Sequence, residues 1–279
     1  MEKVGILYHP LIERAYPLAK ELRYFLDNQK VSVWLCSAWE SEQARRQVDG
    51  TDLILSIGGD GTILRAAQAV LPAAVPITGI NLGKLGFLTE LTVAEVKDEL
   101  PALLAGEGWI DERSVLEAEL TIPGGNSAER YHALNDIVVA RGAVARVIQI
   151  EVSINGELLT NYRADGIIAA TATGSTGYSL AAGGPILYRE ARDFLLLPIL
   201  PHLDFAYPLV LSEAAEVKLV VSTTHEAGLC IDGHINLPLA SGAVVAVKRS
   251  PDTAHFLRIH PAASFYRSLE EKLKGKKTA

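Results

Sequence analysis

The spacing of apolar residues changes near Gly106, and this change divides the chain into two parts of different fold class. In the first part, short apolar runs alternate with segments whose leucines recur at helical spacing, as Leu18, Leu22 and Leu26 do. In the second part, apolar and polar residues alternate with a period of two, as in 116–122. The first pattern predicts a parallel sheet covered by helices, and the second predicts a mainly β domain.

Three segments follow from these patterns. We expect an α/β, Rossmann-like N-terminal domain over 1–110, a mainly β C-terminal domain over 111–258, and a C-terminal segment over 259–279. The last segment carries one apolar stripe at helical spacing between 263 and 274. We therefore expect a C-terminal helix there that returns to the first domain.

Composition and charge give no indication of a nucleic acid or membrane partner. The formal net charge is −7, and the only basic run is a group of lysines at the C-terminus, so we expect no nucleic acid partner. No apolar stretch is long enough for a membrane span, and the N-terminus enters a short strand-like run without a signal-peptide pattern. Cys36 and Cys230 each lie inside an apolar run, as free buried thiols do. We expect a cytoplasmic protein with no membrane partner.

The first segment whose residues are suited to ligand binding or catalysis is the run Gly58-Gly59-Asp60-Gly61-Thr62. It joins an apolar strand-like run, 53–57, to a helical pattern that begins at once, and such a glycine turn before a helix favours phosphate binding. A tight turn with an Asp cap is the structural alternative. Asp60 would repel phosphates unless it holds a metal ion or accepts a proton from an attacking hydroxyl.

A second glycine-containing segment, 81–88, follows the next predicted strand. Ligands of open α/β sheets lie beyond the carboxyl ends of the strands, so we expect both glycine turns to face one cleft. Neither segment has the Gly-x4-Gly-Lys-Ser/Thr pattern of the common phosphate loop, and the chain has no Gly-x-Gly-x-x-Gly dinucleotide fingerprint.

The β part contains two further polar groups. Asn135 and Asp136 interrupt an apolar strand-like run, and a buried polar pair of this kind favours a hydrogen-bonding ligand. A turn or bulge at a strand end is the alternative. The block 162–185 is rich in Gly, Ser and Thr, and its backbone N–H groups and hydroxyls are suited to a polar ligand. Tyr178 offers a flat ring to a base.

Taken together, these blocks resemble the NAD kinase family. The family has a Gly-Gly-Asp-Gly-Thr loop, an Asn-Asp/Glu pair and a Thr-Gly-Ser-Thr-x-Tyr block in this order, and the resemblance covers most of the chain. It implies transfer of a phosphoryl group from ATP, with a divalent cation such as Mg²⁺, to the 2′-hydroxyl of the adenosine ribose of NAD. It also implies a homodimer or homotetramer.

The resemblance also implies roles for individual residues. Asp60 would be the catalytic proton acceptor, and we expect no protein cluster that holds a metal by itself. The residues implied in binding NAD are Gly61, Arg65, Asn135, Asp136, Arg146, Arg163, Asp165, Thr176, Gly177, Tyr178, Ser179, Leu180, Ala181 and His234. His234 stands where the family usually has Gln or Asn, so a solvated hairpin histidine is an equal alternative.

Two other functions are compatible with the glycine loop. A diacylglycerol-type lipid kinase shares the Gly-Gly-Asp-Gly pattern but needs an apolar or basic membrane face, which an acidic chain does not indicate. A non-catalytic NAD sensor would bind phosphate through the loop. It would gain nothing from the carboxylate of Asp60.

Overall fold

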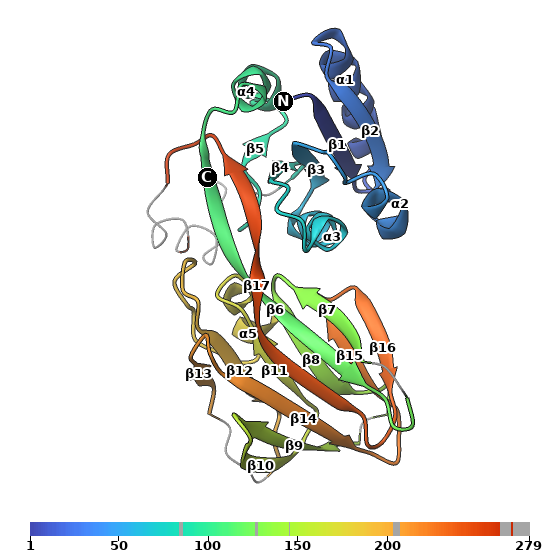
Figure 1. Cartoon of the computed structure of the whole chain (residues 1–279), viewed down its shortest axis with the longest axis vertical. Coiled ribbons are helices and arrows are strands. Elements are labelled where there is room, and N and C mark those ends of the chain that lie inside the picture. The colour runs from blue at the N-terminus through green and yellow to red at the C-terminus, as the bar shows by residue number, and fades with distance from the viewer. Residues whose placement is uncertain (84–85, 126–127, 145, 203–206, 263–268, 270–279) are drawn as a thin grey trace, which may run out of the picture. The chain divides into compact units, whose positions relative to one another are not determined.

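The computed structural model describes all residues except 84–85, 126–127, 145, 203–206, 263–268 and 270–279 (Figure 1). The chain divides into two compact units, and the first consists of 1–112 together with the residues from 254 onward. The second unit is 113–253. The domain limits expected from the sequence, at 110 and 258, stay a prediction.

The first unit is a parallel sheet with helices. Its elements in chain order are β1 (Lys3–Tyr8), α1 (Ala15–Asn28), β2 (Ser32–Ser37), α2 (Ser41–Arg45), β3 (Leu53–Gly58), α3 (Asp60–Val70), β4 (Ile77–Asn81), β5 (Leu91–Thr92) and α4 (Val96–Leu104). The strand order is β4-β3-β1-β2 with all pairs parallel, and β5 pairs with the end of β4. The expected alternation of strands and helices is confirmed.

The helices cover both faces of this sheet. On one face, the leucines of α1 pack with α4 and with Val4, Ile6 and Leu55 of the strands in one buried cluster. On the other face, α3 lies so close to the sheet that a Cβ on Gly79 would be 2.4 Å from Cδ1 of Ile63. Gly79 therefore permits the close approach of α3 to β4.

The second unit is built from antiparallel strands. Its elements are β6 (Trp109–Thr121), β7 (Glu129–Ala133), β8 (Asp136–Arg141), β9 (Ile148–Ile154), β10 (Glu157–Ala164), β11 (Gly166–Ala170), the 3₁₀ turn η1 (Gly174–Thr176), α5 (Tyr178–Ala181), β12 (Phe194–Ile199), β13 (Leu209–Leu211), β14 (Glu216–Ser222), β15 (Ala227–Ile231), β16 (Ile235–Leu239) and β17 (Val244–Arg258). One sheet has the order β13-β12-β11-β8-β15-β16. The other contains β10-β9-β14-β17, with β6 beside β17 and β7 beside β6 (Figure 1).

The core of the second unit lies between the apolar faces of its two sheets. Alternate residues such as Val217, Leu219 and Val221 of β14 are buried in one cluster with Ile137 and Val139 of β8. This period of two is the pattern that the sequence predicted for the β part. The mainly β nature of this unit is confirmed.

The chain returns to the first sheet as predicted, but a different element makes the return. The last strand, β17, pairs in parallel with β4 through Phe256 and Ile77, and Thr78 donates a hydrogen bond to the carbonyl of Leu257. The return is therefore made by a strand and not by the predicted C-terminal helix. That helix, over 263–274, lies outside the described residues except for Leu269.

Candidate active site

The glycine loop of the first unit lies between β3 and α3. Gly59 is extended and precedes the helix, and Asp60 is the first helical residue. A Cβ added to Gly59 or Gly61 would meet no atom within 4 Å. The loop therefore offers open space beside the positive end of a helix, where an anion is favoured.

The carboxylate of Asp60 is held by the second glycine segment. Oδ2 accepts a hydrogen bond of 2.7 Å from the N–H of Phe87, and Oδ1 accepts one of 3.0 Å from the N–H of Leu88. A Cβ on Gly86 would be 2.1 Å from Oδ1 of Asp60. Both carboxylate oxygens are thus oriented by backbone, and the glycine lets the backbone come close. The predicted convergence of the two glycine segments is confirmed within this unit.

Two polar side chains shape the second segment itself. Oδ1 of Asn81 accepts a hydrogen bond from the N–H of Gly83, and the Thr89 hydroxyl accepts one from the N–H of Gly86. Nδ2 of Asn81 also reaches that hydroxyl, at 3.5 Å. These bonds hold Gly83 and Gly86, the described glycines of the segment, to the side chains of Asn81 and Thr89.

Arg65 of α3 lies against an aromatic ring. Its guanidinium carbon is 4.2 Å from the centre of the Trp39 ring, and the His9 ring meets Trp39 edge-on with centroids 4.5 Å apart. Burial, followed by the charge of Arg65, lowers the pKa of His9, so His9 adds no positive charge here at neutral pH. The stack fixes the cation of Arg65 five residues after Asp60 in the same helix.

In the second unit, a buried carboxylate organises the Asn135-Asp136 pair. The oxygens of Asp232 accept hydrogen bonds from the N–H groups of Leu134, Asn135 and Asp136, at 2.9, 2.7 and 3.1 Å. The N–H of Asp232 donates in return to the carbonyl of Asp136. The pair consequently lies at the start of β8 and not inside a strand, because Asp232 takes the N–H groups that a ladder would use. The strand-end alternative is the one observed.

The side chains of the pair face the Gly-rich block. Oδ1 of Asn135 is buried and has no hydrogen-bond partner among the described residues. A Cβ on Gly177 would be 3.6 Å from Nδ2 of Asn135 and 3.9 Å from Oδ2 of Asp136. Burial, and then the nearby charge of Asp232, raises the pKa of Asp136 to about 7. These two side chains can therefore donate to or accept from a polar ligand.

The Gly-rich block continues directly from β11. The Thr171 hydroxyl donates to the carbonyl of Leu134 and accepts from the N–H of Gly174, which ties the block to the start of β8. A Cβ on Gly174 would be only 2.0 Å from the Asn135 carbonyl oxygen. Tyr178 is exposed and Ser179 is buried, in the short helix α5. Of the predicted residues 176–181, Gly177 thus adjoins Asn135 and Asp136.

Three other predicted residues lie at the opposite end of these strands. Gly166 pairs with Ala140, so Asp165 lies beyond the far end of β8 from Asp136, where its carboxylate forms a 2.8 Å ion pair with Arg141. Arg163 belongs to the end of β10, and Arg146 precedes β9, the strand paired with it. Within one chain, the structure does not bring Arg146, Arg163 and Asp165 to Asn135 and Asp136.

His234 occupies the turn between β15 and β16. Its Nδ1 lies 3.0 Å from the Asp232 carbonyl oxygen, in the same turn whose carboxylate holds the start of β8. His234 therefore adjoins the Asn135-Asp136 pair through Asp232. His234 is a half-buried hairpin residue, and its contact with NAD stays a prediction.

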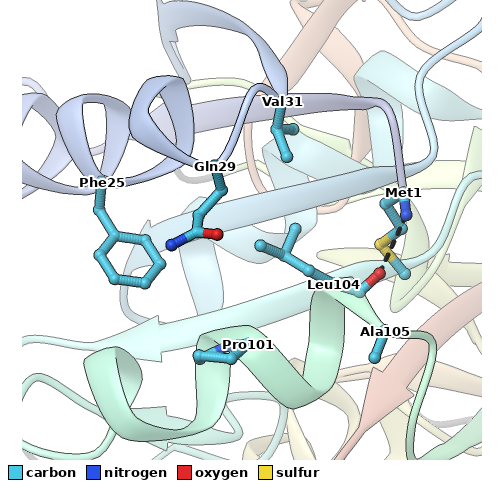
Figure 2. Close-up of a pocket in the computed structure, with 7 residues that line it drawn as sticks. All are labelled: Met1, Phe25, Gln29, Val31, Pro101, Leu104 and Ala105. Carbon is cyan, nitrogen blue, oxygen red and sulfur yellow. Dashed lines mark hydrogen bonds between the residues drawn. The ribbon is translucent and has the colours of Figure 1, made fainter.

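Two further features concern metal binding and cavities. Within the described ranges, no three His, Cys, Asp or Glu side chains gather as a protein metal site requires. A hollow of about 280 Å³ lies in the first unit at the strand edge opposite the glycine loop, because Met1 and Val31 directly precede β1 and β2. It is lined by Met1, Phe25, Gln29, Val31, Pro101, Leu104 and Ala105 (Figure 2). This hollow contains none of the predicted residues.

Comparison with known proteins shows the family to which the chain belongs. The pattern of the ATP-NAD kinase N-terminal domain matches residues 15–108, and that of the ATP-NAD kinase C-terminal domain matches 134–259. The chain belongs to the NAD kinase family. The family expected from the sequence is thereby confirmed, and with it the expected class of enzyme, an ATP-dependent kinase of NAD.

Individual members of the family support this placement. The chain is 48% identical to an NAD kinase of Dehalococcoides mccartyi (strain CBDB1) over 98% of this chain and 96% of the relative. It is 38% identical to an NAD kinase of Chloroflexus aurantiacus (strain ATCC 29366 / DSM 635 / J-10-fl), over 98% of this chain and 99% of the relative.

Two solved structures have the same fold. Yeast NADH kinase complexed with NADH superposes with a TM-score of 0.87 at 27% identity, covering 100% of this chain and 89% of the yeast chain. An NAD kinase from Archaeoglobus fulgidus in complex with ATP gives a TM-score of 0.75 at 26% identity, with 98% of each chain covered.

Sequence reasoning missed four contributors to this site. Asp232 precedes a glycine in a pattern typical of a turn, and nothing in that local pattern links it to Asn135, 97 residues earlier. Trp39 and His9 follow strands β2 and β1 and could have been found from that position alone. Arg258 is the last residue of β17 and does not belong to any recognised motif.

Proposed function

We propose that this chain transfers the γ-phosphoryl group of ATP to the 2′-hydroxyl of the adenosine ribose of NAD, which yields NADP and ADP. The observation that carries the proposal is the Asp60 carboxylate, oriented by the N–H groups of Phe87 and Leu88 beside the open space of Gly59 and Gly61. A loop that only bound phosphate would gain nothing from an oriented carboxylate.

Asp60 acts as the proton acceptor in this proposal. A ribose hydroxyl is a weak nucleophile, and its oxygen bonds to the γ-phosphorus as the bond from that phosphorus to the bridging oxygen breaks. The hydroxyl proton passes to Asp60, and ADP leaves with the bridging oxygen. General base catalysis of this kind contributes typically about 10² to 10⁴ in rate. Positioning supplies much of the remaining acceleration.

The residues near the loop fit a divalent cation that is held mainly by ATP. Each oxygen of the Asp60 carboxylate accepts a single backbone N–H among the described residues, and a carboxylate is a suitable ligand for Mg²⁺. The nucleotide phosphates would supply most other ligands. When bound, the cation neutralises charge on the phosphoryl oxygens. Arg65, fixed by Trp39, adds positive charge from the protein.

The second unit provides the proposed binding site for the adenosine part of NAD. Asn135 offers a buried amide oxygen that has no partner in the described part of the chain, and Asp136, with its pKa raised to about 7, can donate or accept a hydrogen bond at neutral pH. Tyr178 presents an exposed ring on which a base can stack. The other proposed contacts are Gly61, Thr176, Gly177, Ser179, Leu180, Ala181 and His234.

Arg146, Arg163 and Asp165 remain proposed contacts of the rest of the dinucleotide. A cytoplasmic location and a homodimer or homotetramer remain proposals as well. No helix in the described part of the chain is long and apolar enough to span a membrane.

The decisive experiment is incubation of the purified protein with ATP, Mg²⁺ and NAD, NADH or AMP, followed by identification of the products. We expect NADP from NAD. Asp60→Asn should fold and bind NAD normally, with turnover lower by roughly two orders of magnitude or more. Undiminished turnover in this variant would refute the role of Asp60. Activity on lipid vesicles without NAD would favour a lipid kinase, and NAD binding without ATP consumption would favour a sensor.

A further inference from the structure

A buried group of charges lies behind the segment that holds Asp60. Arg258, at the end of β17, is 5% exposed, and Asp111, at the start of β6, is 3% exposed. The guanidinium of Arg258 lies 3.2 Å from a carboxylate oxygen of Asp111 and 3.2 Å from one of Glu90. All three residues belong to the first unit.

This group is connected to Asp60 through one residue. Nη1 of Arg258 donates a 2.8 Å hydrogen bond to the carbonyl of Leu88, and the N–H of Leu88 donates a 3.0 Å hydrogen bond to Oδ1 of Asp60. The neighbouring N–H, of Phe87, donates to the other oxygen of the same carboxylate. A displacement of the Leu88 backbone would therefore be transmitted directly to Asp60.

Glu90 fixes the same segment from its other end. Its N–H donates to the carbonyl of Gly79 in β4. Its Oε1 accepts hydrogen bonds from the N–H groups of Ile259 and His260, at 3.1 and 2.9 Å. The residues that follow Leu88 are thus attached both to the sheet and to the backbone after β17.

Stability alone is a weak reason for such a group. Removing charges from water costs about as much as their attraction returns, so buried ion pairs often contribute little net stability. They do impose one geometry. The planar guanidinium of arginine can donate to two carboxylates and a carbonyl in fixed directions, which lysine cannot reproduce.

We propose that Arg258 is a positioning residue for the reaction, because it holds the Leu88 peptide where that peptide orients the Asp60 carboxylate. The proposal rests on the role of Asp60 given above. It also gives a functional reason for the return of β17 to the first sheet, because the end of this strand places Arg258 against the Leu88 carbonyl.

The test compares Arg258→Lys with a neutral triple variant, Arg258→Met with Glu90→Gln and Asp111→Asn. The triple variant leaves no uncompensated buried charge, so it remains informative where the lysine variant fails to fold. Arg45→Met is the matched control, because Arg45 also donates to a backbone carbonyl in this unit, that of Gln68, which does not contact Asp60. NAD phosphorylation is followed by steady-state kinetics.

We expect the folded Arg258 variants to lose about 10- to 100-fold in kcat, with KM for NAD and ATP within about threefold of wild type. The control should retain its kcat. On an Asp60→Asn background, Arg258→Lys should lower kcat by less than about threefold more, because the residue acts through that carboxylate. Full kcat in the folded variants, or equal losses with and without the Asp60 carboxylate, would overturn the proposal.

Hydrogen exchange of the 86–90 backbone gives a readout that does not depend on activity. We expect faster exchange of the Phe87 and Leu88 amides in the Arg258 variants and unchanged exchange in the Arg45 control. Unchanged exchange at these two amides would overturn the proposal even if kcat fell. If the wild-type protein did not phosphorylate NAD while exchange still depended on Arg258, the proposed function would fail and the structural link would stand.

Discussion

Gly86 is the position at which one added carbon most directly disturbs the proposed catalytic group. In Gly86→Ala, the new Cβ would be 2.1 Å from Oδ1, 2.5 Å from Cγ and 2.7 Å from Oδ2 of Asp60. Non-bonded atoms require about 3.5 Å, so the carboxylate has to retreat by about 1 Å or more. That movement also breaks its hydrogen bonds to Phe87 and Leu88.

The expected cost follows from this displacement. A misplacement of about 1 Å in a catalytic group lowers the rate by about 10²-fold, which corresponds to about 2.7 kcal/mol in the activation free energy. Because the three atoms nearest to the added methyl group all belong to Asp60, we expect kcat to fall by this factor while KM for NAD and the melting temperature change little. Steady-state kinetics of NADP formation and thermal unfolding measure the two effects.

Gly83→Ala is the matched control, because it changes the same segment by the same atom. A Cβ on Gly83 would meet nothing within 4 Å, and its backbone is not in the left-handed region. We expect its kcat to stay within about threefold of wild type. If folded Gly86→Ala were as active as Gly83→Ala, the assignment of Asp60 as an oriented catalytic carboxylate would be wrong.

Two further predictions concern the second unit. Gly174→Ala should destabilise the protein by about 2 kcal/mol or more and weaken NAD binding, because its Cβ would be 2.0 Å from the Asn135 carbonyl oxygen. Gly177→Ala, with its nearest contact at 3.3 Å, should lower the melting temperature much less, and thermal unfolding compares the two variants. The pKa of Asp136 is raised from 3.8 to about 7, so its protonated form contributes stability that is complete below 3.8 and is lost as the pH rises to about 7. The melting temperature of Asp136→Asn relative to wild type should therefore increase between pH 5 and pH 8, and a constant difference would contradict the burial argument.

Local sequence patterns were sufficient to predict the parts of the site that are formed by residues close together in the chain. The loop from Gly58 to Thr62 follows a strand and opens a helix, so its position at the carboxyl edge of the sheet followed from the order of residues alone. The convergence of 81–88 on the same edge followed from the same rule. The Asn135-Asp136 pair was found as a polar interruption, but its place at a strand start was not, because that depends on Asp232.

The sequence alone was enough to recognise the family and the two fold classes and to propose Asp60 as the reactive carboxylate, because these depend on short motifs and on the periodicity of apolar residues. Only the tertiary structure determined what holds that carboxylate. Its partners at Phe87 and Leu88 lie 27 and 28 residues away, and Arg258, which fixes Leu88, lies 170 residues further along. Hydrogen bonds between distant segments leave no periodic signal, so the orientation of Asp60 becomes visible only in the folded chain.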